Sequence, residues 1–260
     1  MKAVSNFKKL RIFILLSVLF LVAAGSWLTQ WRTTSWEKPL VVAIYPINGD
    51  GSEKSANYIE NLSLQEFDDI EAFFRDEAEQ FQLDLRQPFD IVMGPILTEH
   101  PPAPPKNRNM LGVVWWSLKM RLWASGVAGD IGPPAHIQIF VLYNDPKINQ
   151  RLAHSLGLQK GLLGVVHAFA GSRQASGNNV VIAHELLHTV GASDKYDLQT
   201  NLPIYPMGYA EPDKEPALPQ EFAELMAGRI PLSQNEARQA RDLGLVMIGE
   251  HSAREIRWVK

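Results

Sequence analysis

Residues 184–194 read HELLHTVGASD and combine side chains that bind metal ions with one that can activate water. His184 and His188 are four residues apart, so in a helix they lie on one face, one turn apart. Two imidazoles placed in this way can bind the same ion. Glu185 would lie about 100° around the helix from His184, which keeps it off the ion but close to a water bound there. The spacing therefore predicts a zinc site suited to hydrolysis.

A catalytic zinc ion usually has three protein ligands and one open position. The chain contains no cysteine, so the third ligand must be a histidine, an aspartate or a glutamate. Gly191 can end the helix abruptly, and the chain could then bring Asp194 back to the metal. Two alternatives remain open: the nearby Asp197, or a distant glutamate such as Glu221 or Glu224. The distant glutamate would leave Gly191 and Asp194 without a role.

The pattern is uncommon by chance. A match to H-E-x-x-H has a probability on the order of one in a hundred in a chain of this composition, and adding the glycine and the aspartate lowers it to about four in a hundred thousand. The ordinary interpretation is a buried helix that carries two satisfied histidines. The remaining histidines form no spaced cluster, and we expect surface or core roles for them: His100, His136, His154, His167 and His251.

HELLHTVGASD is similar to the extended zinc motif H-E-x-x-H-x-x-G-x-x-H/D of the metzincin metallopeptidases, and its final aspartate resembles the snapalysin-like branch. The segment AELMAGR, residues 223–229, resembles the methionine turn that follows in that branch. The resemblance implies three zinc (Zn²⁺) ligands, His184, His188 and Asp194. It also implies Glu185 as the general base, Gly191 as a structural support and Met226 as the methionine beneath the zinc. Met207, in YPMGY, is the alternative for that last role.

The sequence departs from the family pattern in two places. Several metzincins carry a tyrosine two residues after the turn methionine, where this chain has Gly228. Tyr196, Tyr209 or Arg229 could stabilise an oxyanion instead. The third ligand is a carboxylate rather than an imidazole, and its charge should make a bound water less acidic than three neutral ligands would.

The N-terminus has the features of a membrane or export segment. An apolar run extends from Ile12 to Leu28, and the apolar character continues to Trp31. Four basic residues precede this run: Lys2, Lys8, Lys9 and Arg11. A basic flank of this kind directs the N-terminus to the cytoplasm and the rest of the chain across the membrane. We expect a single-pass anchor over residues 12–31, or a signal segment cleaved near residue 25 that would give a secreted protein.

The composition of the 260 residues is that of a globular protein, with 46% hydrophobic and 20% charged residues. The net charge of −3 offers no basic field for nucleic acid, so we expect no nucleic-acid partner. We expect a cytoplasmic stub and membrane segment over residues 1–31, a linker over 32–38 and one domain over 39–260. The sequence gives no indication of the oligomeric state.

The pattern of elements predicts an α/β (α+β) domain. Apolar runs predict strands over residues 39–47, 89–97, 136–144 and 161–170. Helical periodicity or composition predicts helices over residues 63–81, 111–122, 179–190 and 233–245. We expect an irregular segment over 196–219 and a short helix or turn over 220–228. The metzincin resemblance implies a mixed sheet, an active-site helix and a small C-terminal subdomain. Trp115, Trp116 and Trp123 could mark a surface that faces a membrane or substrate, or could be core residues.

The resemblance implies a membrane-anchored or exported zinc-dependent endopeptidase that acts on a peptide or protein substrate outside the cytoplasm. Glu185 would act as the general base on a zinc-bound water, and the substrate would pair as an added strand with the edge strand of the cleft, expected at residues 161–170. The alternative is a membrane-tethered binding or assembly protein with a structural zinc site. Such a site usually has four protein ligands, and Asp197 could be the fourth.

Overall fold

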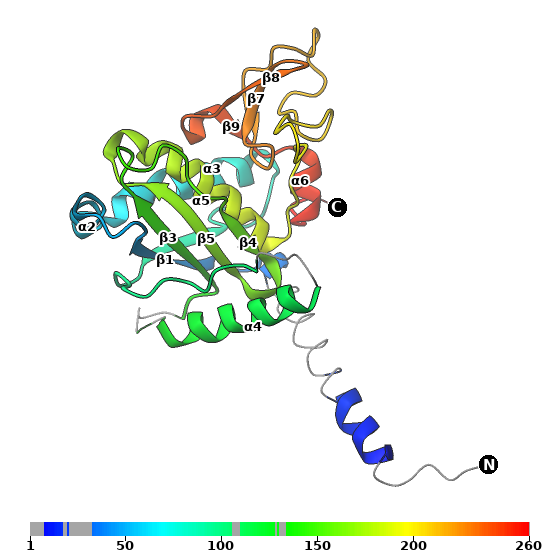
Figure 1. Cartoon of the computed structure of the whole chain (residues 1–260). Coiled ribbons are helices and arrows are strands. Elements are labelled where there is room, and N and C mark those ends of the chain that lie inside the picture. Colours follow the sequence, from blue (N-terminus) through cyan, green and yellow to red (C-terminus); the bar gives the residue numbers. More distant parts are fainter. Residues whose placement is uncertain are drawn as a thin grey trace.

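The computed structural model describes residues 8–17, 20, 33–105, 110–127, 129 and 134–259. Figure 1 shows helices packed on both faces of a twisted sheet, with a smaller unit of short strands beyond one end of it. The predicted mixed α/β architecture is therefore confirmed.

The main sheet has the strand order β2-β1-β3-β5-β4. Four strands are parallel: β1 (Leu40–Asn48), β2 (Phe89–Met93), β3 (Ile137–Asn144) and β5 (Leu163–Phe169). The short strand β4 (Leu156–Leu158) runs antiparallel to β5 and forms one edge. Strands β1 and β3 are buried almost throughout, which explains why both appear in the sequence as continuous apolar runs.

The expectation that residues 161–170 form the edge strand was wrong. Strand β5 has a neighbour on each side, and the edge strand next to it is β4, whose three residues read LGL. A strand of this length has too few residues to show a period of two, so its sequence carries no strand signal of its own.

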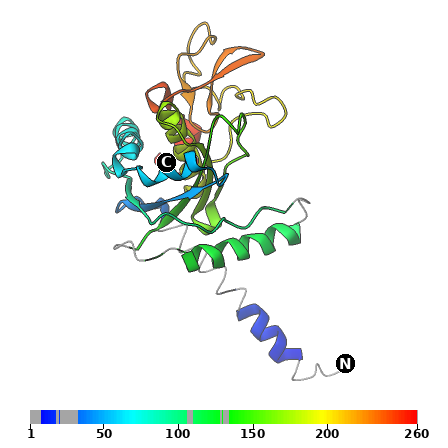
Figure 2. The ribbon, with the colours of Figure 1, turned by 60° about the vertical axis from the view of Figure 1, so that its left-hand side comes forward.

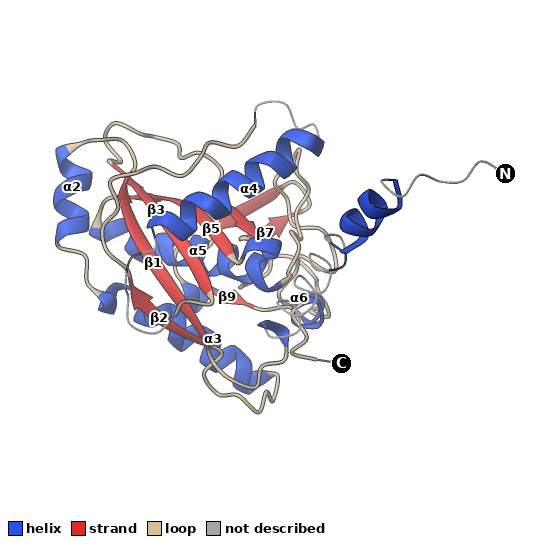
Figure 3. Ribbon diagram, turned by 90° about the horizontal axis from the view of Figure 1, so that it is seen from below, coloured by secondary structure: helices blue, strands red, loops and turns tan. Residues whose placement is uncertain are grey.

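Two apolar clusters lie on opposite faces of the sheet because successive strand residues point to opposite faces. On one face, the core includes residues of α2 (Glu53–Glu60), α3 (Asp68–Gln80) and α5 (Ala175–Val190). Helix α4 (Met110–Val127) lies on the other face (Figure 3). Its residues Met120 and Ala124 pack on the strands there. The sheet thus separates α4 from α5.

The C-terminal unit consists of short elements. Strand β6 (Ala223–Glu224) pairs with β9 (Val246–Met247), and β7 (Arg229–Ser233) pairs with β8 (Glu236–Gln239). The chain ends in α6 (Glu250–Glu255). The predicted helix over residues 233–245 was therefore wrong, because pairing with β7 overrides the helix propensity of its glutamate, alanine and arginine residues. For the segment 220–228, expected to be a short helix or turn, the turn is confirmed, and two of its residues form β6.

The predicted membrane segment, residues 12–31, lies mostly outside the described residues, although residues 8–17 are helical. Across the described part of the chain, no helix combines the length and apolar character needed to cross a membrane. In the segment expected to be a linker, Trp36 is buried and its Nε1 donates a hydrogen bond to the carbonyl of Ile256 at 2.7 Å. This bond ties the start of the folded part to its last helix.

Glu77, on α3, is a buried carboxyl group that should make stability depend on pH. Burial raises the pKa of Glu77 to about 7, from an ordinary value of 4.5, against the lowering effect of the hydrogen bond from the Ile248 backbone. The unfolded state loses its proton near pH 4.5 and the folded state near pH 7. The contribution of Glu77 to the free energy of unfolding therefore falls as pH rises through this window.

We expect Glu77→Gln to raise the free energy of unfolding at pH 8 by up to about 3 kcal/mol and to reduce its slope between pH 4.5 and 7. The amide oxygen can still accept the hydrogen bond from Ile248, 2.7 Å away in the parent. Urea denaturation across this pH range measures the effect, with the exposed Glu79→Gln as control. Identical pH profiles for parent and Glu77→Gln would contradict the assignment.

Candidate metal centre

Helix α5 presents both histidines of the predicted site and then stops. Gly191 caps it in the left-handed region, with φ +119°, and its N–H donates to the carbonyl of His188. A side chain at Gly191 would be strained there, and its Cβ would lie 2.7 Å from Nε2 of Gln159. The chain can therefore reverse at Gly191 and return Asp194 toward the helix.

The predicted helix over residues 179–190 is confirmed, but its start was placed four residues too late. The helix begins at Ala175, and two asparagines within it bind neighbouring elements. Asn178 exchanges two hydrogen bonds with the backbone of Phe169 at the end of β5. The amide of Asn179 donates to the carbonyl of Glu66 and to Oδ1 of Asp69. These contacts fix α5 to the sheet and to α3, a role that the asparagine type alone does not reveal.

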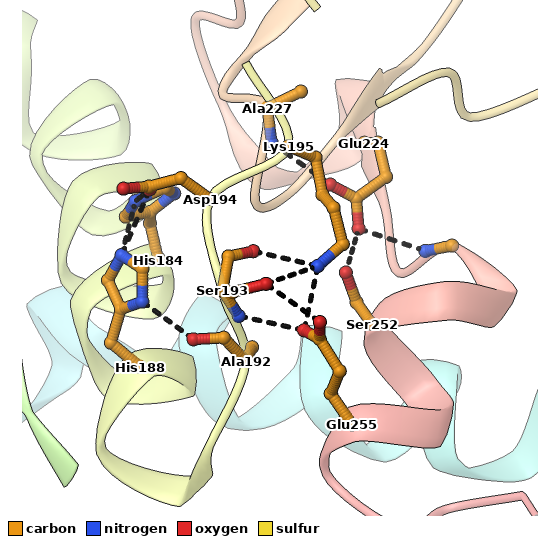
Figure 4. A network of polar contacts seen from close by, with 11 residues as sticks. His184, His188, Ala192, Ser193, Asp194, Lys195, Glu224, Ala227, Ser252 and Glu255 are labelled. Carbon is orange, nitrogen blue, oxygen red and sulfur yellow. Dashed lines mark hydrogen bonds and ion pairs between the residues drawn. The ribbon is translucent and has the colours of Figure 1, made fainter. Parts of the chain in front are cut away.

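Three potential ligand atoms converge where Asp194 returns (Figure 4). Nε2 of His188 lies 3.1 Å from Nε2 of His184 and 3.1 Å from Oδ1 of Asp194, and the third side of the triangle is 3.3 Å. A tetrahedral zinc ion with bonds of about 2.0–2.1 Å holds its ligand atoms roughly 3.3 Å apart. The three atoms therefore match one triangular face of such a tetrahedron.

Both imidazole rings are oriented by backbone carbonyls. Nδ1 of His184 lies 2.9 Å from the carbonyl of Leu225, and Nδ1 of His188 lies 2.8 Å from the carbonyl of Ala192. A carbonyl oxygen only accepts, so each Nδ1 carries a proton and donates it. Each Nε2 then points to Asp194, where a cation can take the place of an Nε2 proton shared with the carboxylate. A protonated Nδ1 held by a carbonyl is the arrangement that usually orients metal-binding histidines.

The carboxylates of Asp194 and Glu185 make the centre favour positive charge, either a proton on His184 or a metal ion. Burial would raise the pKa of Asp194, but hydrogen bonds from His184 and His188 outweigh it and hold the pKa well below its usual range. Burial would lower the pKa of His184, but the contact with Asp194 and the charge of Glu185 raise it to about 8. The histidine side chains are 14% and 17% exposed and that of Asp194 is 35% exposed, so an ion can reach them from solvent.

Glu185 lies beside the ligands and has one uncommitted oxygen. The residue is buried, and its Oε2 has no hydrogen-bond partner within the described part of the chain. Burial raises the pKa of this carboxyl group, while the two histidines lower it. Gly157 of β4 packs so closely that a Cβ there would lie 2.5 Å from the carbonyl of Glu185 and 3.3 Å from Oε2. A buried oxygen without a partner is costly, which suits a group that binds water or substrate.

The rival third ligands are engaged elsewhere. Oδ1 of Asp197 accepts hydrogen bonds from Gln199 and Thr200 within its own loop. The Glu221 carboxylate accepts a hydrogen bond from Lys214, and the fully buried Glu224 accepts one from Ser252 at 2.6 Å. The structure thus brings Asp194, and none of the three rivals, to the two histidines.

The candidate supporting residues differ in their environment. Met226 is fully buried and directly follows Leu225, whose carbonyl orients His184, whereas Met207 is 38% exposed. Among the candidate oxyanion stabilisers, Tyr196 interacts with Asp194 through a hydrogen bond and its pKa is raised, mainly by burial. Tyr209 packs its ring on Tyr205.

Sequence reasoning missed the network that holds Asp194. Its neighbours Ser193 and Lys195 both bind Glu255 on α6 (Figure 4). Nζ of the buried Lys195 lies 2.7 Å from Oε2 of Glu255, and the backbone N–H of Lys195 donates to the carbonyl of Met226. Sixty residues separate Lys195 from Glu255, so no local pattern could have linked them.

No protein-family model matches this sequence, and neither does any curated protein. The geometry of the centre therefore carries the functional interpretation. Within the described residues, His184, His188 and Asp194 form a group that can hold a metal ion. Nitrogen and carboxylate donors suit zinc but also other first-row divalent ions.

We expect Asp194→Ala to weaken zinc binding by more than about 100-fold, since loss of a ligand should exceed the 10–100-fold cost of losing a supporting contact. Asp197→Ala removes a nearby carboxylate that is bonded within its own loop, and should leave the affinity unchanged. Competition with a chromogenic chelator measures both dissociation constants. Equal affinities for Asp194→Ala and the parent would contradict the ligand assignment.

Proposed function

We propose that this protein is a zinc-dependent endopeptidase of the metzincin type. The observation that carries the proposal is the triangle of His184, His188 and Asp194 with the uncommitted oxygen of Glu185 beside it. Two neutral imidazoles and one carboxylate are a donor set that zinc accepts, and three protein ligands leave a position open for catalysis. A structural zinc site would need a fourth protein ligand, and Asp197 is bonded elsewhere.

Zinc, when bound, supplies a Lewis acid that makes water more acidic and polarises a peptide carbonyl. Glu185 accepts a proton from the water while the water oxygen attacks the carbonyl carbon. The carbon–nitrogen bond then breaks, and Glu185 passes the proton to the leaving amine. Tyr196 interacts with Asp194 through a hydrogen bond and is therefore the candidate oxyanion stabiliser that we favour.

The substrate would pair with β4. This strand pairs with β5 on one side only, and through Gly157 it packs directly on the helix that carries Glu185. An extended peptide can add to such an edge by backbone hydrogen bonds. The scissile bond, which is part of the added strand, would then face the metal ligands.

An arginine-lined cavity suggests the substrate class. The cavity, of about 450 Å³, is lined by Arg173, Arg238 and Arg241 together with Gly177 and Val181 of α5. The spacing of Gly177 and Val181 relative to the two histidines places all four on one face of the helix. The three arginine side chains form no ion pair within the described residues. We therefore propose that acidic side chains near the scissile bond favour cleavage.

We expect Glu185→Gln to lower kcat by at least about 100-fold, because the amide cannot act as a general base, while zinc content stays at the parent level. Peptide hydrolysis and elemental analysis on the same samples measure the two effects. Glu79→Gln, an exposed substitution on α3, is the control and should leave both unchanged. Turnover by zinc-loaded Glu185→Gln at the parent rate would rule out this base.

To test the cavity, we use Arg238→Ala, which should lower kcat/KM about five-fold for peptides with an acidic residue near the cleaved bond. A loss of this size corresponds to the free energy of one exposed ion pair. Peptides in which that residue is neutral should be cleaved at the parent rate. Arg86→Ala, which removes an exposed arginine outside the cavity, should change neither class. An equal loss for acidic and neutral peptides would show that Arg238 does not select charge.

A further inference from the structure

The outer face of α4 is apolar and exposed. Its large side chains recur at helical spacing and include Met110, Leu111, Val114, Trp115, Leu118 and Leu122. The exposed fraction is 61% at Trp115, 73% at Leu122 and 83% at Leu111. A continuous apolar stripe of this kind on a helix surface marks a contact site rather than scattered surface residues.

Contacts on the inner face fix the rotation of α4. Met120 and Ala124 are buried against the sheet, and the Trp123 ring lies 4.6 Å from that of Phe140. Nε1 of Trp116 donates a hydrogen bond to the carbonyl of Pro102 at 2.8 Å. The helix cannot turn its outer stripe inward without losing these contacts. The stripe is therefore a stable surface of the folded protein.

The charges beside the stripe are all positive. Lys119 and Arg121 lie on opposite sides of it, and the helix contains no acidic residue. Nζ of Lys119 lies 5.8 Å from the centre of the Trp115 ring. Leucine and tryptophan on one face with lysine and arginine at its margins are typical of helices that lie in the surface of an anionic membrane. A second copy of this helix would offer no carboxylate to these cations.

The position of α4 in the fold also agrees with a contact to a membrane surface. In two views, α4 lies on the side of the sheet toward which residues 8–17 extend (Figures 1 and 2). The apolar run that is predicted to enter a membrane continues to Trp31, two residues before Thr33, where the folded part begins. A bilayer that holds this run would lie within a few residues of the domain, and α4 would be near its surface.

We propose that α4 lies in the headgroup region of an anionic lipid bilayer, with the stripe from Leu111 to Leu122 inserted and Lys119 and Arg121 at the lipid phosphates. The sheet then stands between the bilayer and α5. The candidate metal centre is held on the side away from the lipid, so its partly exposed ligands stay accessible to water-soluble substrates. The membrane contact itself does not depend on the proposed peptidase activity.

The absence of native cysteine allows a direct test on the full chain. A fluorophore at Leu118→Cys reports the centre of the stripe, and one at the exposed Gln234→Cys reports the turn between β7 and β8. Each labelled protein is bound to vesicles of phosphatidylcholine and phosphatidylglycerol, with or without brominated acyl chains. We expect brominated lipid to quench the label at position 118 at least about two-fold and to leave that at 234 unchanged.

A label at position 118 that brominated lipid does not quench would overturn the proposal, whether the label is water-exposed or shielded by protein. Shielding without quenching would identify a second copy or the chain's own N-terminal segment as the occupant. Quenching that is equally strong on pure phosphatidylcholine vesicles would overturn the role of Lys119 and Arg121 in selecting anionic lipid.

Discussion

The candidate metal centre depends on the reversal of the chain after α5. The two histidines lie on the helix itself, but Asp194 reaches them only because the helix ends at Gly191 and the next residues are held in place. The buried ion pair between Lys195 and Glu255 fixes the loop to α6, and Ser193 binds the same carboxylate. The loop that carries the proposed third ligand is thereby held by contacts of the kind that a metal site requires.

The rest of the fold positions α5 against these contacts. Asn178 and Asn179 bind β5 and the region around α3, and Gly157 lets β4 pack on the turn that carries Glu185 and His188. The C-terminal unit supplies the carbonyl of Leu225, which orients His184. Both β4 and the C-terminal unit therefore contribute a contact to the candidate centre. In the proposed orientation on a membrane, the same sheet that supports α5 also separates it from the lipid.

Features encoded by local spacing could be predicted from the sequence, and features set by distant contacts could not. The apolar strands β1 and β3, helix α5 and the ligand spacing of His184 and His188 depend on periodicity within a few residues. The edge strand β4 is too short to show a period, and the β7–β8 hairpin is stabilised by pairing against its helix propensity. Glu255 gave no signal because its role arises from residues 60 positions earlier.

The proposed function requires a zinc ion with three protein ligands and one open position. X-ray absorption spectroscopy of the zinc-loaded full chain, with zinc content measured on the same sample, tests it most directly. We predict one zinc per chain, coordinated by four nitrogen or oxygen atoms, of which two are imidazole nitrogens and one is an exchangeable water. Zinc bound by four protein ligands without water, or no stoichiometric zinc in the folded protein, would contradict the proposal.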